Sequence, residues 1–225
     1  MGTVVAARDE RLQRPVALKL LRTDTATDTT LRLWREARAA AAVRHPAICQ
    51  VFDVGEEDGH LYIAMELLEG ETLAARLARG AMPFGEALDL ALTLLDAIDA
   101  IHAQQLLHRD LKPANLMLTG RGLKVLDFGL ARPPSAATAP TMPITSNLTQ
   151  EGMMIGTPGY MAPEVLEGAP PDVRSDLFAA GAVLFEMLAG QPAFPGASRS
   201  RSRMRSCTRG HRRSPAILQL RPSTA

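Results

Sequence analysis

The chain has 225 residues and a mass of 24.2 kDa, which predicts one domain, or one domain with a tail. Apolar residues make up 46% and charged residues 22%, so the composition excludes a disordered chain, a collagen-like repeat and a disulfide-rich mini-protein. The two cysteines, Cys49 and Cys207, match no metal-ligand spacing. Their scarcity is typical of a reducing compartment, so we expect a cytoplasmic protein.

The net charge of +1 conceals a difference between the body of the chain and its C-terminal end. Residues 199–225 contain eight arginines and no lysine, aspartate or glutamate, whereas residues 1–198 contain 17 basic and 24 acidic residues. No stretch reaches the roughly 18 consecutive apolar residues of a membrane helix, and the N-terminus lacks the pattern of a signal peptide. We therefore expect an acidic globular body with a basic tail and no membrane segment.

The first 70 residues predict mostly β-structure with one helix. Two β-rich runs, Val4–Arg8 and Pro15–Leu21, flank a polar turn and predict a hairpin. Apolar residues at helical spacing predict a helix over Asp28–Val43, which a proline then ends. Alternating runs predict a second pair of strands, at Ile48–Val54 and His60–Glu66.

The following residues, to about 198, predict mainly helices. A helix is expected over Phe84–Gln105, with one apolar stripe that contains Leu88, Ala91, Leu92, Leu95, Ile98 and His102. A short strand is expected over Leu123–Leu126, and residues 133–150 are rich in Pro, Ser, Thr and Ala, which predicts a loop. The segment Asp176–Ala189 is apolar almost all round, which predicts a buried helix.

Four polar clusters carry the chemistry of the sequence. Lys19 ends the apolar run Val16-Ala17-Leu18-Lys19, where a lysine either reaches the surface or meets a carboxylate such as Glu36. The segment His108–Asn115 gathers catalytic and anion-binding side chains in a loop that a proline shapes. The third cluster, Asp127-Phe128-Gly129, follows an apolar strand and is typical of a metal ligand or of an ordinary turn. The fourth is the turn-rich segment Gly156–Glu164.

In this order the four clusters resemble the eukaryotic-type protein kinases, and specifically the bacterial serine/threonine branch. Val16–Lys19 resembles the third-strand lysine motif, and His108–Asn115 resembles the catalytic loop. Asp127–Gly129 and Met161–Glu164 resemble the two ends of the activation segment. The resemblance covers residues 2–196. It implies an α+β, protein kinase-like bilobal fold, with a β-rich N-lobe over about 1–68 and a helical C-lobe over about 69–198, incomplete at both ends.

The resemblance also assigns a role to each matching residue. Asp110 matches the catalytic base and Lys112 the residue that steadies the γ-phosphate of ATP. Lys19 matches the lysine that holds the α- and β-phosphates, with Glu36 as its helix partner, and Asn115 and Asp127 match the ligands of two Mg²⁺ ions. The expected adenine pocket consists of Gly2, Val4, Ala17, Met117, the backbone of the hinge Glu66–Leu68, and Met65 at the gatekeeper position.

The remaining polar residues receive other roles from the same resemblance. Asp176 matches a buried aspartate that braces the catalytic loop, and His108 and Phe128 match packing residues. Arg109 matches an arginine that receives a phosphate on the activation loop, while Thr157 marks serine/threonine specificity. The candidate phosphate acceptors are Thr138, Thr141, Thr145, Ser146 and Thr149.

The two ends depart from the family pattern. Only Gly2 remains of the glycine-rich loop, and residues 199–225 replace the expected helices with an Arg/Ser-rich tail, which we expect to be disordered or frame-shifted. The alternative is a basic tail that contacts nucleic acid or anionic lipid. This tail contains no aromatic residue, so we expect no nucleic acid partner.

The resemblance implies transfer of the ATP γ-phosphate, with Mg²⁺, to serine or threonine hydroxyls of protein substrates in signalling, including self-phosphorylation. A different hypothesis is a non-catalytic kinase-like binding module that truncation has inactivated. The sequence retains the full set of expected catalytic residues, which favours the enzyme, whereas the altered ends favour the binding module.

Overall fold

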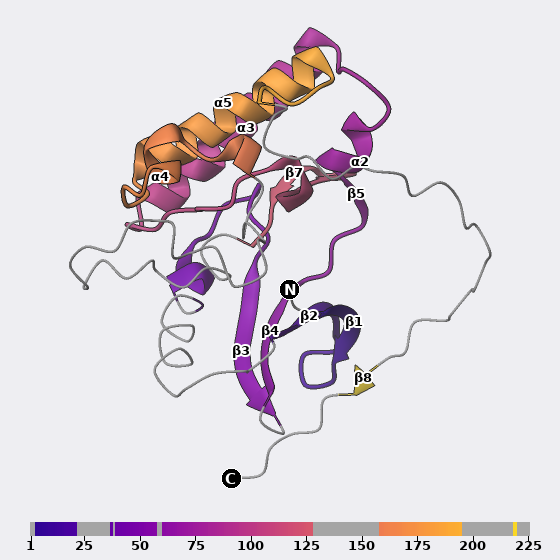
Figure 1. The fold of residues 1–225 in the computed structure, drawn as a ribbon. Helices are drawn as coiled ribbons and strands as arrows, with labels where there is room; N and C mark the ends of the chain where they lie inside the picture. Colours follow the sequence, from indigo (N-terminus) through magenta and orange to yellow (C-terminus); the bar gives the residue numbers. More distant parts are fainter. Residues whose placement is uncertain are drawn as a thin grey trace, which may run out of the picture.

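The computed structural model describes residues 3–21, 37, 39–57, 60–127, 158–194 and 218–219 (Figure 1). The elements in chain order are β1 (Thr3–Asp9), β2 (Arg14–Leu21), β3 (Val51–Glu57), β4 (His60–Glu66), β5 (Gly70–Thr72), α2 (Leu73–Leu77), α3 (Phe84–His102), the 3-10 turn η1 (Pro113–Asn115), β6 (Leu116–Thr119), β7 (Gly122–Val125), the 3-10 turn η3 (Pro158–Tyr160), α4 (Pro163–Leu166), α5 (Val173–Ala189) and β8 (Leu218–Gln219). Among these described elements, none is a helix of the length and apolarity that crossing a membrane requires.

The N-terminal part is a sheet with the strand order β3-β4-β2-β1-β8. The expected hairpin is confirmed, because β1 and β2 pair in antiparallel register with Ala6 opposite Ala17. The pairing of β3 with β4 is also antiparallel, as expected. The two-residue strand β8 pairs in parallel with the outer edge of β1. The rest of the tail lies outside the described residues, so its expected disorder stays a prediction.

The second strand pair begins later than expected. Residues 48–50 do not join β3, because Ile48 instead forms a parallel bridge with Val125 of β7. Two backbone hydrogen bonds fix this bridge: the amide of Cys49 donates to the carbonyl of Val125 at 2.9 Å, and the amide of Val125 donates to the carbonyl of Ala47 at 2.7 Å. The segment that precedes β3 is thus tied to the other half of the molecule.

Strand alternation decides which side chains of β2 face the rest of the molecule. Val16 and Leu18 are buried with Ala7 and Ala64 in a small cluster of their own. Ala17 is buried on the opposite face with Ile63 and Met65, in the main core that continues into the helical part. Lys19 lies two residues after Ala17 and therefore on the same face, and only 7% of its surface is exposed.

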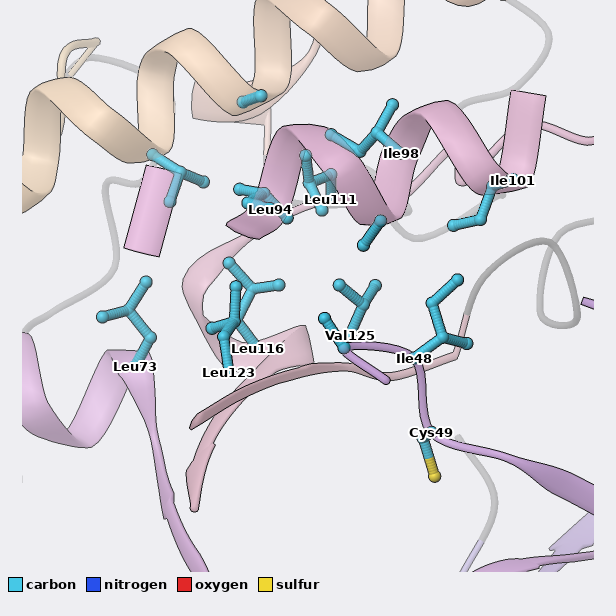
Figure 2. Close-up of a cluster of buried hydrophobic side chains, with 14 of the residues drawn as sticks. Ile48, Cys49, Leu73, Leu94, Ile98, Ile101, Leu111, Leu116, Leu123 and Val125 are labelled. Atoms are coloured by element: carbon cyan, nitrogen blue, oxygen red, sulfur yellow. The ribbon is translucent and has the colours of Figure 1, made fainter. Parts of the chain in front are cut away.

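The main core lies between α3 and the small sheet β5-β6-β7. Figure 2 shows Leu94 and Ile101 of α3 above Leu116 and Val125 of the sheet, while Ile98 lies on the side of α3 nearer α5. The side chain of Ile48 reaches the same cluster from the segment before β3, so both halves of the molecule contribute to one continuous core (Figure 2).

The helix expected over Phe84–Gln105 is confirmed but ends at His102 instead of Gln105, and its expected apolar stripe is buried only in part, at Ala91 and Ile98. Leu88, Leu92 and Leu95 are 40%, 54% and 42% exposed. The buried face consists of Ala87, Ala91, Leu94, Ala97, Ile98 and Ile101. Apolar residues surround most of this helix, so the pattern alone did not fix the rotation. Small alanines permit the close packing with α5, which lies along α3 in Figure 1.

Helix α5 begins three residues earlier than expected because Asp172 caps it. The Asp172 carboxylate accepts from the amides of Arg174 and Ser175, and the Ser175 hydroxyl completes a capping box. The helix ends at Gly190, where φ is +68° and a Cβ would lie 2.7 Å from the amide nitrogen of Ala81. The expectation of complete burial is wrong for one face, where Val173, Leu177, Phe185 and Leu188 are 40–48% exposed.

Two expected segments lie largely outside the described residues. Of the helix expected over Asp28–Val43, residues 37 and 39–42 are described and helical, whereas Glu36 is not described. The expected loop over 133–150 is not described either. Strands β5 and β6 were not predicted from the sequence.

Candidate active site

Asp110, Lys112 and Asn115 form one cluster between α3 and β6. The ammonium of Lys112 lies 2.6 Å from Oδ2 of Asp110. The amide nitrogen Nδ2 of Asn115 donates to the backbone carbonyl of Asp110 at 2.7 Å and to Oδ2 at 3.0 Å. Pro113 occupies the first position of η1, so the chain turns back at once and brings Asn115 beside Asp110. These contacts hold the Asp110 carboxylate in one orientation while it remains 38% exposed to an incoming group.

Asp176 of α5 anchors the loop that carries Asp110 through hydrogen bonds to the loop backbone, and this aspartate is only 2% exposed. Its Oδ2 accepts from the amide of His108 at 2.8 Å and its Oδ1 from the amide of Arg109 at 2.9 Å. Nε2 of His102 lies 2.9 Å from Oδ2. Arg109 has a φ of +65°, a conformation that costs a non-glycine residue of order 1–3 kcal/mol and that such anchoring maintains.

His108 connects this loop with the strand that leads to Asp127. Nε2 of the imidazole lies 3.1 Å from the carbonyl of Leu126, and Nδ1 accepts from the amide of Asp110 at 3.4 Å. Both contacts are satisfied by a neutral ring protonated at Nε2. Burial lowers the pKa of His108 below the ordinary value, although the nearby carboxylates of Asp176 and Asp110 act in the opposite direction.

Asp127 follows β7 and is brought beside Asn115 by the backbone. The amide of Leu126 donates to the carbonyl of Asn115 at 2.9 Å. Asp127 itself adopts a φ of +53°, a left-handed conformation that Asp tolerates better than most residues. Its Oδ1 lies 2.7 Å from Nζ of Lys19 on β2. The structure therefore joins the lysine of the N-terminal sheet to the carboxylate beside Asn115.

The donor set of this cluster fits Mg²⁺ bound together with phosphates. Both hydrogen bonds of the Asn115 amide use Nδ2, so Oδ1 is turned away from Asp110 and is suited to bind a cation. Asp127 adds a carboxylate. Within the described ranges there is no group of three or more His, Cys, Asp or Glu side chains suited to hold a metal. A site of one carboxylate and one amide is the kind that Mg²⁺ uses when phosphates and water complete its octahedron.

Three of the expected adenine-binding side chains, Val4, Ala17 and Met117, lie on β1, β2 and β6. Ala17 is buried and pairs with Met65, while Val4 is 57% exposed and pairs with Lys19. Met117 lies on β6, in the small sheet β5-β6-β7. Strands β2 and β6 belong to different sheets, and the expected sandwich of the adenine ring stays a prediction.

Lys124 was not predicted from the sequence. It lies on β7 between the buried residues Leu123 and Val125, and its Nζ is 2.7 Å from Oε2 of Glu66. The signal for it was a lysine in a strand of buried apolar residues, three positions before Asp127. That alternation predicts a side chain on the face opposite the core, but it does not name the partner.

A hollow beside Asp110 is lined by Lys112, Met161, Val165 and Ala179. It opens between the catalytic-loop cluster and the segment that leads into α4. Several expected residues lie outside the described part of the chain: Gly2, Glu36, Phe128, Gly129, Thr157 and the candidate phosphate acceptors Thr138, Thr141, Thr145, Ser146 and Thr149. The predicted ion pair of Lys19 with Glu36 therefore remains a prediction, and the partner that the structure gives Lys19 is Asp127.

The sequence and the fold of this chain are similar to those of known proteins. The family model described as "Protein kinase domain" matches residues 1–221. The chain belongs to this family. The chain is 41% identical over 206 residues to the serine/threonine-protein kinase PknB of Mycobacterium leprae, which covers 88% of this chain and 32% of that protein. It is 39% identical over 204 residues to the serine/threonine-protein kinase pkn2 of Myxococcus xanthus, which covers 87% of this chain and 24% of that protein.

The solved structures agree with the sequence comparison. The kinase domain of Mycobacterium tuberculosis PknI matches with a TM-score of 0.68 and 30% identity, over 92% of this chain and 74% of that chain. The protein kinase fold expected from the sequence is thus confirmed, as is the resemblance to the bacterial serine/threonine kinases. The chain spans about a third or less of the length of these two curated relatives.

Proposed function

We propose that this protein kinase domain transfers the γ-phosphate of ATP, with Mg²⁺, to serine or threonine hydroxyls of proteins. The observation that carries the proposal is the connected cluster of two lysine–carboxylate pairs, Lys112–Asp110 and Lys19–Asp127, joined through Asn115 and Leu126. Phosphoryl transfer demands little covalent chemistry from a protein. It needs positioned cations, metal ligands and one carboxylate, and this cluster supplies those groups.

Asp110 is the residue that accepts the proton of the acceptor hydroxyl. Its carboxylate is held by Lys112 and Asn115 but is still partly exposed, so a hydroxyl in the adjoining hollow has a path to it. Lys112, at 2.6 Å from Asp110, places a positive charge where negative charge develops during transfer. The acceptor hydroxyl is thereby oriented and deprotonated by groups of this chain.

Lys19 and Asp127 act at the opposite end of the cluster. Asn115 and Asp127 would hold Mg²⁺, which when bound neutralises charge on the phosphates of ATP. Lys19 is almost buried, so its ammonium has little freedom and provides a fixed positive charge for the phosphate oxygens. The backbone of 66–68, with Ala17, Val4 and Met117, would bind adenine.

The test is transfer of labelled phosphate from ATP to a serine-containing peptide, a threonine-containing peptide and the matching tyrosine peptide. We expect labelling of the serine or threonine peptide, with Mg²⁺ required. Asp110→Asn keeps the shape of the side chain but cannot take the proton, so transfer should fall by about 10²-fold or more. Transfer that survives in Asp110→Asn would overturn the assignment of the base.

The same assay separates the alternative function. A non-catalytic binding module would bind Mg-ATP or a protein partner and yet transfer no phosphate under any of these conditions. Mass spectrometry of the chain itself, after incubation with ATP, tests whether self-phosphorylation accompanies transfer to peptides. We place the proposed reaction in the cytoplasm, where ATP is available and where the buried free thiol of Cys49 stays reduced.

A further inference from the structure

Glu66, the last residue of β4, is held by contacts from several segments. Its amide donates to the carbonyl of Gln50 at 2.9 Å, and the thiol of Cys49 lies 3.7 Å from its carbonyl. Its carboxylate oxygen Oε2 accepts from Nζ of Lys124 at 2.7 Å and from the amide of Gln50 at 3.4 Å. Backbone and side chain of this single residue are therefore both fixed from outside β4.

The thiol of Cys49 stays protonated at neutral pH and can donate a hydrogen bond to the carbonyl of Glu66. Burial, followed by the nearby Glu66 carboxylate, raises the pKa of Cys49 to about 12. Figure 2 shows the sulfur directed away from Ile48 and Val125, which fits its contact with Glu66 on the other side of the chain. The carbonyl of Glu66 consequently accepts a hydrogen bond from the Cys49 thiol.

Lys124 and Glu66 are more enclosed than the ion pairs on the surface. Their side chains are 13% and 26% exposed, whereas the exposed pair Arg79–Glu71 has values of 57% and 39%. Water screens the pair less as exposure falls, and removal of one partner leaves the other charge partly buried and uncompensated. Breaking the ion pair between Lys124 and Glu66 therefore costs more free energy than breaking an ion pair on the surface.

The position of Lys124 on β7 connects two parts of the proposed ATP site. Lys124 pairs with Met117 of β6, and opposite residues of an antiparallel pair share one face of the sheet. Lys124 therefore lies beside the side chain expected under adenine. Three residues after Lys124, and two after the end of β7, Asp127 meets Lys19. Strand β7 and the two residues after it consequently carry both the anchor of Glu66 and the carboxylate expected to bind Mg²⁺.

We propose that Lys124 is a positioning residue for the nucleotide: its ion pair with Glu66 fixes the backbone of 66–68 relative to β7, and so sets the adenine-binding segment at the correct distance from Asn115 and Asp127. This proposal rests on the proposed function, because it assigns the segment 66–68 to adenine. The role is mechanical, and Lys124 itself contacts neither ATP nor Mg²⁺.

The experiment measures the full chain in four forms besides the natural one. Lys124→Met removes the charge but keeps most of the chain length, and Lys124→Arg keeps the charge. Arg79→Met is the matched control in an exposed ion pair. Ile98→Val, in the buried face of α3, is a control for a modest general loss of stability.

The first measurement is amide hydrogen exchange without any ligand. In Lys124→Met we expect exchange over 65–69 to rise by about tenfold, while exchange in α3 and in the β1–β2 hairpin stays the same. Lys124→Arg should remain near the natural protein and Arg79→Met should leave this segment unchanged. Unchanged exchange over 65–69, or a rise spread evenly over α3 and the hairpin, would overturn the proposal.

The second measurement is the dissociation constant for Mg-ATP. It should increase by about tenfold in Lys124→Met, and much less in Ile98→Val even if that variant unfolds at a similar temperature. An equal increase in both would show a merely structural role. If the natural chain binds no Mg-ATP while exchange responds as expected, the proposed function fails and the anchoring of 66–68 by Lys124 still stands.

Discussion

Nζ of Lys19 lies 2.7 Å from Oδ1 of Asp127, and this ion pair connects β2 of the N-terminal sheet with the residue that follows β7. The lysine side chain is 9% exposed and the aspartate side chain 31%, so the carboxylate remains reachable from the side opposite the lysine. A cation and a carboxylate held in this way are suited to bind a phosphate and its metal ion together.

Lys19→Met should reduce phosphate transfer by about 10²-fold or more, because a fixed positive charge aimed at the phosphates is lost. Asp127→Asn should have a comparable effect through the loss of a metal-binding charge, and asparagine tolerates the left-handed φ of this position. The measurement is the initial rate of peptide labelling from ATP. Arg14→Met, on the same strand and in an ion pair with Asp9, serves as control and should retain most of the rate.

Asp176→Ala should lower the free energy of unfolding by about 3 kcal/mol, since the buried amides of His108 and Arg109 and the ring of His102 each lose an acceptor. Urea unfolding followed by circular dichroism measures the change. The control is Asp172→Ala, which removes the exposed cap of the same helix and should have a smaller effect. Equal losses in the two variants would contradict the bracing role of Asp176.

His108 should make the protein less stable in mild acid. Burial lowers its pKa in the folded state, so below the ordinary value of 6.5 the unfolded chain binds a proton that the folded chain does not. The free energy of unfolding therefore decreases as the pH falls through this range. Unfolding at about pH 5.5 and about pH 7.5 measures the slope, which should be smaller in His108→Gln.

A direct measurement on the same histidine needs no substitution. NMR of histidine-labelled natural protein should show one imidazole that stays neutral until the protein unfolds. An imidazole at this position that titrates near 6.5 in the folded protein would contradict the predicted decrease in stability.

Activity should depend on a phosphate between Asp127 and Glu164. A phosphate adds nearly two negative charges and forms strong bidentate hydrogen bonds with arginine, and Arg109 is the arginine beside the catalytic aspartate. Mass spectrometry with and without phosphatase treatment identifies the site, for which Thr145 and Thr149 are the preferred candidates. Dephosphorylated protein should lose most of its peptide labelling, and Arg109→Gln should make the rate insensitive to phosphatase. Full activity after dephosphorylation would rule out this dependence.

The order of the local motifs was sufficient to predict the fold and to bring together the residues of the cluster around Asp110. Asp110, Lys112 and Asn115 lie within six residues of one another, so a short turn determines their geometry. The hairpin and the second strand pair were predictable for the same reason, because alternation and turn residues are local signals.

Contacts between distant segments could not be predicted in the same way. The ion pair of Lys19 with Asp127 was not predicted, and the expected pair of Lys19 with Glu36 lies outside the described residues and stays a prediction. The pair Lys124–Glu66 was not predicted either. The buried face of α3 was predicted only in part because its apolar residues extend around most of the helix, and packing against both α5 and the small sheet decides which of them are buried.

The backbone bridge between Ile48 and Val125 bears on how the protein melts. The bridge belongs to both halves of the molecule, and the core around Ile48, Leu94 and Val125 has no boundary between them (Figure 2). Opening either half would therefore expose apolar surface of the other. Thermal unfolding should accordingly follow one cooperative transition, with equal calorimetric and van't Hoff enthalpies, instead of two separate steps for sheet and helices.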